Sequence, residues 1–192
     1  MTKPLAIPAR LDVTRVLGGD PGARGGWAAI DLAEPGYVAS GVACSAIERQ
    51  TAIASYVTGS TLVVLESWTA GGEWGVAQML GLGSQRGRWL EALELAGVPE
   101  SSIVGVYPQT WRTTLAPLAR RTGEEAKRSA LLVAKAIAKR PLASTDEAEA
   151  ICIAKWAAEV VRVQRGVIGR AAAAASRSSR RSAKSVTLNG ER

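Results

Sequence analysis

Histidine is absent from this sequence of 192 residues. Without an imidazole there is no Ser-His-Asp triad, no histidine general base and no histidine-bound zinc. Cysteine occurs only at Cys44 and Cys152, each within an apolar run, which predicts two buried, reduced thiols in a cytoplasmic protein and no metal cluster. Any metal ion must therefore be held mainly by oxygen ligands, which suits Mg²⁺ or Mn²⁺. We expect no organic cofactor.

Long apolar runs are missing as well. No stretch of 18 apolar residues occurs, so we expect no membrane-spanning segment. The apolar start of the chain is interrupted by Pro4 and Pro8 and does not have the form of a secretory leader. Phenylalanine is also absent, whereas six tryptophans are present. The length is sufficient for one domain with a full hydrophobic core.

Positive charge is in excess, and it is unevenly distributed. The formal net charge is +7, and residues 164–192 carry seven Lys or Arg against one Glu. Residues 112–140 carry eight basic side chains against two acidic ones. A basic band together with a basic tail indicates a polyanionic partner, most simply nucleic acid. The alternative is that the charge only keeps the protein soluble.

The order of strand-like and helix-like segments predicts an α/β fold. Three strands separated by short turns, at 13–19, 25–32 and 36–46, indicate an antiparallel meander. The apolar runs 61–67 and 102–107 are typical of buried parallel strands. Helical patterns are expected at 47–56, 76–96 (broken near Gly81 to Gly83), from Pro108 (short helix or loop), 124–139 and 146–163. We therefore predict a mixed five-stranded sheet flanked by helices in residues 1–170, and a basic, disordered tail in residues 171–192.

Four acidic residues stand out by their positions. Asp20 follows the first predicted strand, Glu66 ends the fourth, and Asp146 and Glu149 share one face of a helix that Ser144 or Thr145 can cap. Each has a plain explanation, as a turn aspartate, a strand end in solvent, or acids that complement a helix dipole.

The four acids take on another meaning if the first and fourth strands are neighbours. Asp20 and Glu66 then converge at the carboxyl ends of the strands, and the acidic helix can point at the same place. Four carboxylates in one small volume repel one another unless cations neutralise them. Two divalent ions about 3.5–4 Å apart would do so, and such a pair supports phosphodiester hydrolysis.

With these motifs in this order, the chain resembles the RuvC-type Holliday junction resolvases of the ribonuclease-H-like superfamily. The matching pieces are Gly19-Asp-Pro-Gly22 with Gly26-Trp27, Leu-Val-Val-Leu-Glu66, and Asp146-x-x-Glu149-Ala150 before an apolar helix. The resemblance covers roughly residues 13 to 163. It implies a ribonuclease-H-like fold and a homodimeric, Mg²⁺- or Mn²⁺-dependent endonuclease that nicks two strands of a four-way DNA junction symmetrically.

The resemblance also implies roles for single residues. Asp20, Glu66, Asp146 and Glu149 take the places of the catalytic metal ligands, although bacterial members often have Asp where this chain has Glu149. Lys127 corresponds to a lysine near the scissile phosphate. The expected DNA contacts are Arg112, by a looser correspondence, Arg128, and an aromatic wedge into the junction supplied by Trp68 or Trp74. Either tryptophan could instead be packed within its loop.

Further expectations concern assembly and source. The family interface lies on helices, so apolar residues of the 76–96 helix are candidates, or else belong to the core: Met79, Leu80, Leu90 and Leu93. The Ser/Arg-rich tail has no family counterpart that we can place. The match to compact, variant members suggests a bacteriophage source, acting in the cytoplasm of an infected or bacterial cell.

Three other functions stay open at this point. Another ribonuclease-H-like nuclease, acting on RNA–DNA hybrids or branched DNA, would use the same acids. A non-catalytic DNA-binding protein on the same fold is a second alternative, and the complete acid set argues against it. An actin-like phosphotransferase with Asp20-Pro-Gly22 as a phosphate loop is a third, and it needs a much longer chain.

Overall fold

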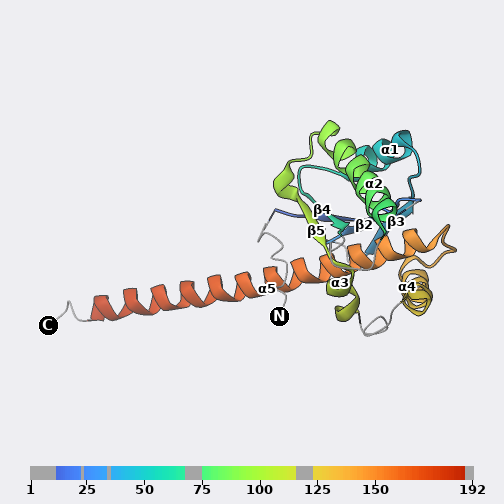
Figure 1. The fold of residues 1–192 in the computed structure, drawn as a ribbon. Helices are drawn as coiled ribbons and strands as arrows, with labels where there is room; N and C mark the ends of the chain where they lie inside the picture. Colours follow the sequence, from blue (N-terminus) through green and yellow to red (C-terminus); the bar gives the residue numbers. More distant parts are fainter. Residues whose placement is uncertain (1–11, 23, 34–35, 68–74, 116–122, 189–192) are drawn as a thin grey trace.

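The computed structural model describes residues 12–22, 24–33, 36–67, 75–115 and 123–188, and for residues 167–188 the course of a helix alone. Figure 1 shows the order of the elements along the chain. The strands are β1 (Arg15–Asp20), β2 (Gly26–Asp31), β3 (Gly36–Val42), β4 (Thr61–Glu66) and β5 (Ile103–Val106). The helices are α1 (Ala46–Tyr56), α2 (Val76–Leu95), the short 3₁₀ helix Glu100–Ser102, α3 (Pro108–Thr114), α4 (Gly123–Ala138) and α5 (Thr145–Leu188).

The predicted mixed sheet is confirmed. The described strands form one five-stranded sheet in the order β3-β2-β1-β4-β5. β1, β2 and β3 pair antiparallel, as short turns require, whereas β4 pairs parallel with β1 and β5 parallel with β4. β1 and β4 are therefore neighbours. This is the condition under which Asp20 and Glu66 converge.

Helices cover both faces of the sheet, and each face has its own core. On one face α1 and α2 enclose a cluster that contains Leu17, Ile53 and Trp89. On the other face α4 and α5 enclose a larger cluster that contains Val16 and Ile151. β1 and β4 are buried on both faces, which explains why β4 has no polar residue between Thr61 and Glu66.

Two glycines let α5 approach the sheet closely. A Cβ atom at Gly18 would lie 2.5 Å from the backbone nitrogen of Ala154 and 2.6 Å from the carbonyl oxygen of Ala150. A Cβ at Gly26 would overlap the carbonyl group of Asp146. A larger residue at either position would push the helix outward. Gly18 and Gly26 therefore set the depth at which the acidic end of α5 sits.

Two helices differ from the sequence-based prediction. α2 runs unbroken through Gly81 and Gly83. Each glycine costs roughly 1 kcal/mol of helix stability. Trp89 and Leu93, nearer the C-terminal end of α2, are buried in the core, and their burial offsets this cost. α5 continues past residue 170 to Leu188, where a disordered tail was expected. The alanine-rich stretch after Arg170 favours helix and contains no proline.

Exposure corrects two smaller predictions. Cys44 is exposed because it lies between the end of β3 and the cap of α1, whereas Cys152 is buried as predicted. On α2, Leu93 is fully buried in the core, and Leu90 packs against it. Met79 and Leu80 are exposed and remain candidates for an interface. No helix in the part of the chain that is described is long and apolar enough to cross a membrane.

Candidate active site

Asp20 and Glu66 lie at the ends of two adjacent parallel strands. Gly19 pairs with Leu65, so the next residue of each strand is an acid. Both side chains are buried, with an exposed fraction of 5% each. The Asp20 carboxylate accepts a hydrogen bond from the backbone N–H of Gly22 through Oδ1 (3.1 Å), which orients it within the Asp-Pro-Gly turn.

The start of α5 brings the other two acids to the same place. Ser144 caps the helix, because its hydroxyl accepts the backbone N–H of Glu147 (3.1 Å). Asp146 Oδ2 accepts the backbone N–H of Arg24 (3.0 Å), and a Cβ at Gly22 would lie only 2.7 Å from the same oxygen. The turn after β1 and the first turn of α5 are thus in direct contact, which places Asp146 over the Asp20 turn.

Two residues of α3 hold the glutamates. Trp111 is fully buried, and its indole Nε1 donates a hydrogen bond to Glu66 Oε1 (3.0 Å). The Arg112 guanidinium donates to Glu149 Oε1 (2.6 Å) and stacks 4.9 Å from the centre of the Trp111 ring. The predicted basic residue Arg112 therefore belongs to the site. Trp111 was missed, since a buried tryptophan in a short helix has no sequence signal that distinguishes it from an ordinary core residue.

The four carboxylates act on one another electrostatically. Burial raises the pKa of Asp20 well above its ordinary value, and the charges of Glu66, Glu149 and Asp146 raise it further. Burial and the charge of Glu149 raise the pKa of Glu66 to about 7, against the opposing effects of Trp111 and Arg112. Asp20 also shares a hydrogen bond with Glu149. The four predicted acids are therefore brought together, and their mutual repulsion is unfavourable unless a cation compensates it.

The donor set is suited to hard divalent cations. Each member is a carboxylate, and the second oxygens of Glu66 and Asp146 accept no hydrogen bond from the described residues. Among the described residues, however, no three or more such side chains already lie close enough together to hold a metal ion.

A fifth acid, Glu147, has a structural role that the sequence did not reveal. Its side chain is fully buried and accepts hydrogen bonds from Arg140 Nη2 (2.5 Å), Ser40 Oγ (2.6 Å) and the backbone N–H of Ala143 (2.6 Å). Ser40 lies on β3, 107 residues away in sequence. This network attaches the start of α5 to the edge of the sheet, next to Asp146. No local pattern could indicate the link to Ser40, because Ser40 and Glu147 meet only in the fold.

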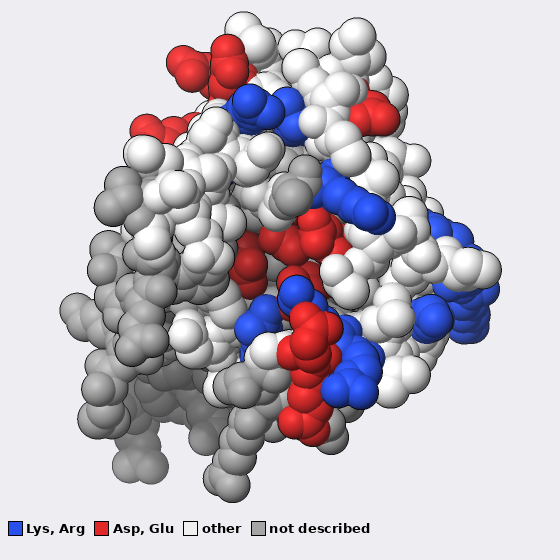
Figure 2. Space-filling model, turned by 45° about the vertical axis from the view of Figure 1, so that its right-hand side comes forward, with Lys and Arg blue, Asp and Glu red and all other residues white. Residues whose placement is uncertain are grey.

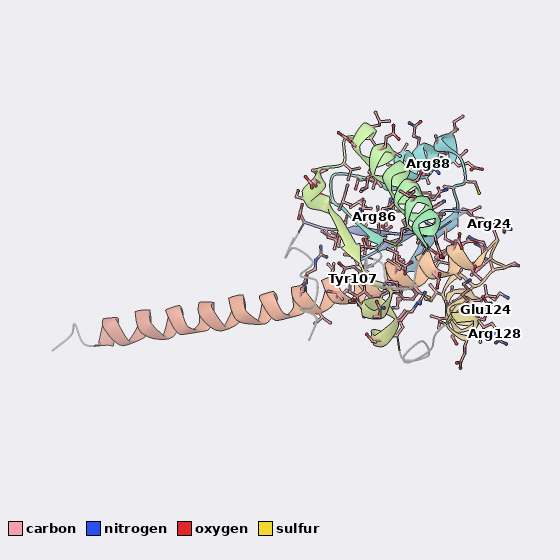
Figure 3. All side chains as sticks on the ribbon, viewed as in Figure 1. Arg24, Arg86, Arg88, Tyr107, Glu124 and Arg128 are labelled. Carbon is pink, nitrogen blue, oxygen red and sulfur yellow. The ribbon has the colours of Figure 1, made fainter. Side chains whose placement is uncertain are left out.

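The remaining predicted DNA contacts lie elsewhere or outside the described residues. Lys127 is on α4, half exposed, and pairs with Glu124 on its own helix (3.3 Å). Its neighbour Arg128 is exposed on the same helix, as Figure 3 shows. Within the described residues no ion pair joins either of them to the four carboxylates, so their roles remain predictions. Trp68 and Trp74, the predicted wedges, fall in the segment 68–74, which lies outside the described residues.

The surface has a polarity that fits an anionic substrate. In the view of Figure 2, acidic side chains lie in a depression of one face, and lysine and arginine side chains stand around it.

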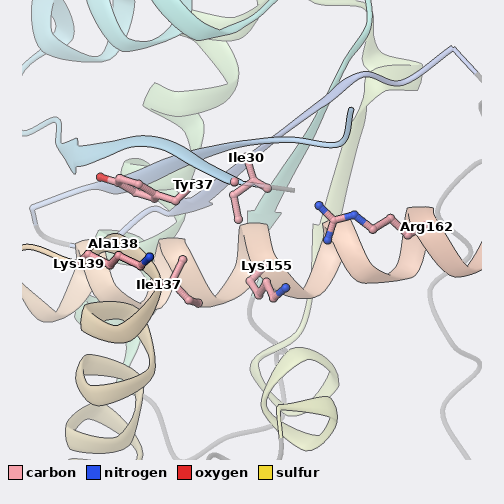
Figure 4. A pocket seen from close by; sticks show the side chains of 8 residues that line it. Ile30, Tyr37, Ile137, Ala138, Lys139, Lys155 and Arg162 are labelled. Atoms are coloured by element: carbon pink, nitrogen blue, oxygen red, sulfur yellow. The ribbon is translucent and has the colours of Figure 1, made fainter. Parts of the chain in front are cut away.

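A separate hollow of about 400 Å³ lies between the sheet edge, α4 and α5 (Figure 4). It is lined by Tyr37, Lys139, Lys155 and Arg162 among others, and includes none of the four carboxylates. Lys155 there pairs with Glu159 (2.5 Å).

Comparison with known proteins shows the fold. No protein-family model matches the sequence, and no curated protein matches it. Two similar solved structures are Thermus thermophilus RuvC (19% identity, TM-score 0.57) and T. thermophilus RuvC in complex with a Holliday junction substrate (18% identity, TM-score 0.58). Each comparison covers 78% of this chain and 96% of the other. The chain therefore has a RuvC-like, ribonuclease-H-like fold. Neither structure bears on the suggested bacteriophage source.

Proposed function

We propose that this protein is a divalent-metal-dependent endonuclease that resolves four-way DNA junctions. The observation that carries the proposal is the convergence of Asp20, Glu66, Asp146 and Glu149 from two strand ends and one helix start. Mg²⁺ and Mn²⁺ prefer oxygen ligands, and two such ions would neutralise the repulsion among the four carboxylates. The similarity in fold to a protein bound to a Holliday junction substrate supports the choice of DNA substrate.

The four acids are the residues that would hold the metal. When bound, Mg²⁺ or Mn²⁺ ions supply a nucleophile from water and stabilise charge on the attacking and leaving oxygens. The chain itself orients the ligands. The indole of Trp111 holds one oxygen of Glu66, and the Arg24 backbone N–H holds one oxygen of Asp146, so the second oxygen of each is left for the cation.

Arg112 has a second part in this proposal. Its guanidinium pairs with Glu149 and is partly exposed to solvent. A guanidinium has five N–H donors, so a scissile phosphate placed over the carboxylates would come within reach of those that are neither bonded to Glu149 nor, like Nε, buried. Arg112 would then stabilise the negative charge that develops during in-line displacement. Lys127 is proposed as a further cation near the phosphate, and Arg128 as a backbone contact.

Symmetric nicks in two strands require two sites. We propose that the protein acts as a homodimer, with the exposed Met79 and Leu80 of α2 contributing to the interface. A hydrophobic pair that is exposed on one helix is small by itself, so the dimer is expected to be strengthened by the junction. Sedimentation velocity at micromolar concentration, with and without a junction, tests this. A monomer under both conditions counts against it.

One experiment tests the function. The protein is incubated with a synthetic four-way junction, a linear duplex and an RNA–DNA hybrid, each with and without Mg²⁺, and products are separated by strand. The proposal expects paired nicks in the junction only, and only with Mg²⁺. Preferred cleavage of the hybrid would assign the other nuclease activity that the same acids allow. Binding to the junction without cleavage in either Mg²⁺ or Mn²⁺ would indicate a non-catalytic DNA-binding protein.

A further inference from the structure

A hollow of about 390 Å³ lies on the α2 side of the sheet, where β4 and β5 end. One wall is formed by Ser67, the residue after Glu66, and by Tyr107, the residue after β5. The other wall is formed by residues of α2: Gly83, Arg86, Gly87 and Leu90. None of the four carboxylates lines this hollow. Successive side chains along a strand point to opposite faces. The hollow therefore lies at the same end of β4 as Glu66 but on the α2 face of the sheet, whereas Glu66 faces Trp111 of α3.

Arg86 is the unusual member of the hollow. Its Nε atom is buried, and it has no hydrogen-bond partner in the described part of the chain. Its Nη2 atom would lie 3.5 Å from a Cβ at Gly105, so the guanidinium lies close to β5. Figure 3 places Arg86 on α2 and Tyr107 before α3. A buried N–H donor without a partner is unfavourable, so this site calls for an acceptor that the described residues do not supply.

The charge of Arg86 also has no carboxylate partner in the part of the chain that the structure describes. The cation that acts on Glu66 is Arg112, which pairs with Glu149. No acidic side chain of the described residues pairs with Arg86, whereas other arginines of the domain, such as Arg15 and Arg140, have carboxylate partners. The hollow thus offers a guanidinium, the hydroxyl groups of Ser67 and Tyr107, and glycines that permit close approach. This combination suits an anion with two equivalent oxygens.

We propose that Arg86, Ser67 and Tyr107 form a subsite for a phosphodiester of the DNA backbone near the scissile phosphate. The inference rests on the proposed function, since DNA must reach the carboxylates for a neighbouring phosphate to reach the hollow. Arg86 binds in this account and takes no part in bond breaking. Its loss therefore weakens binding and shifts the register of the strand, while the metal ligands stay unchanged.

Neutral backbone substitution tests the contact directly. Four-way junctions are made with a single uncharged methylphosphonate at each backbone position around the cut, and binding is measured in Ca²⁺. Wild-type protein is compared with Arg86→Met and with the control Arg88→Met, an exposed arginine on the same helix. At one position the methylphosphonate is expected to weaken wild-type binding by about tenfold, as for one charge-assisted hydrogen bond, and to leave Arg86→Met binding unaffected.

Two further measurements support the assignment. The slope of log affinity against log salt should fall by about 0.9 in Arg86→Met, the value for one phosphate contact on a duplex. Tyr107→Phe removes only a hydroxyl from a partly exposed ring, so it folds even if Arg86→Met does not. It should weaken the effect of the methylphosphonate at that same position and at no other.

The outcomes separate this inference from the proposed function. One outcome is that the wild type cuts the junction while each methylphosphonate weakens binding by Arg86→Met as much as binding by the wild type. In that case the proposed subsite is wrong, and the proposed nuclease function is unaffected. If Arg86→Met dissociates a dimer without altering the methylphosphonate profile, the hollow belongs to an interface between copies, which also overturns the subsite. If the wild type binds no junction, the proposed function fails and the subsite with it.

Discussion

Replacement of Glu66 by glutamine is expected to stabilise the metal-free protein at pH 8 while abolishing cleavage. The Glu66 carboxylate is buried beside other carboxylates, so its charge is unfavourable until a cation binds. Glutamine has nearly the same shape and no charge. Its Oε1 can still accept the hydrogen bond from Trp111, so the packing around the side chain need not change.

The magnitude follows from the pKa of Glu66. The pKa rises from 4.5 to about 7 in the folded protein. Because the folded value is higher, the folded state holds more protons between these limits, and stability falls as the pH rises from 4.5 through 7. The charged form therefore costs roughly 3 kcal/mol above pH 7. Glu66→Gln should recover a gain of this order at pH 8, or about 6–12 °C in Tm for a domain of this size.

Chemical denaturation with a chelator present, at pH 5 and at pH 8, measures the effect. The absence of histidine makes this window unusually clean, since no side chain with an ordinary pKa titrates there. The pKa of Asp20 is also raised, so Asp20 adds to the loss of wild-type stability as the pH rises. The charge of Glu66 is one cause of that raised pKa, and the neutral amide in Glu66→Gln removes it. Glu91→Gln, on the exposed side of α2, is the matched control and should change stability by no more than about 0.5 kcal/mol.

Two results would refute the reasoning. One is a wild-type protein that is more stable at pH 8 than at pH 5 without metal. The other is a Glu66→Gln variant that gains no more than the Glu91→Gln control at pH 8. Either would mean that Glu66 is solvated or paired when charged, and the argument that this site needs a cation would lose its basis. Added Mg²⁺ should stabilise the wild type at pH 8 and have little effect on Glu66→Gln.

Three other predictions concern the site and its surroundings. Asp146→Asn should abolish cleavage in Mg²⁺ yet bind a junction as well as the wild type, and Ca²⁺ should likewise permit binding without cutting, as gel-shift and cleavage assays can check. Gly26→Ala should destabilise the fold by several kcal/mol or shift α5 and lose metal binding, because its Cβ would overlap the Asp146 carbonyl; calorimetry with Mn²⁺ distinguishes the two. Lys127→Ala should slow single-turnover cleavage with little change in affinity, whereas deletion of residues 176–192 should weaken binding, flatten its salt dependence and leave the single-turnover rate unchanged.

The sequence predicted what depends on local patterns and missed what depends on long-range contacts. The strands and the positions of Asp20 and Glu66 at strand ends followed from apolar runs that end in an acid, and the short turns indicated the antiparallel meander. The pairing of β1 with β4 did not follow, and the sequence left it as a condition. The partners of these acids did not follow, since Trp111 and Glu66 are 45 residues apart and Ser40 and Glu147 are 107 apart. The continuation of α5 was missed for a different reason. The composition of residues 171–192 indicates that they contribute no core, but an alanine-rich segment can form a helix without one.

The glycines under α5 bear on how related chains can be judged. Gly18, Gly22 and Gly26 all face α5 at distances too short for another side chain. A homologue could keep all four acids and still be inactive if one of these glycines became larger, because the acidic helix end would no longer reach the strand ends. Conversely, a chain that has lost its acids but kept the glycines retains the shape of the site. A substitution at a glycine, which has no side chain to take part in the chemistry, can thus mark the loss of activity in a protein of this fold.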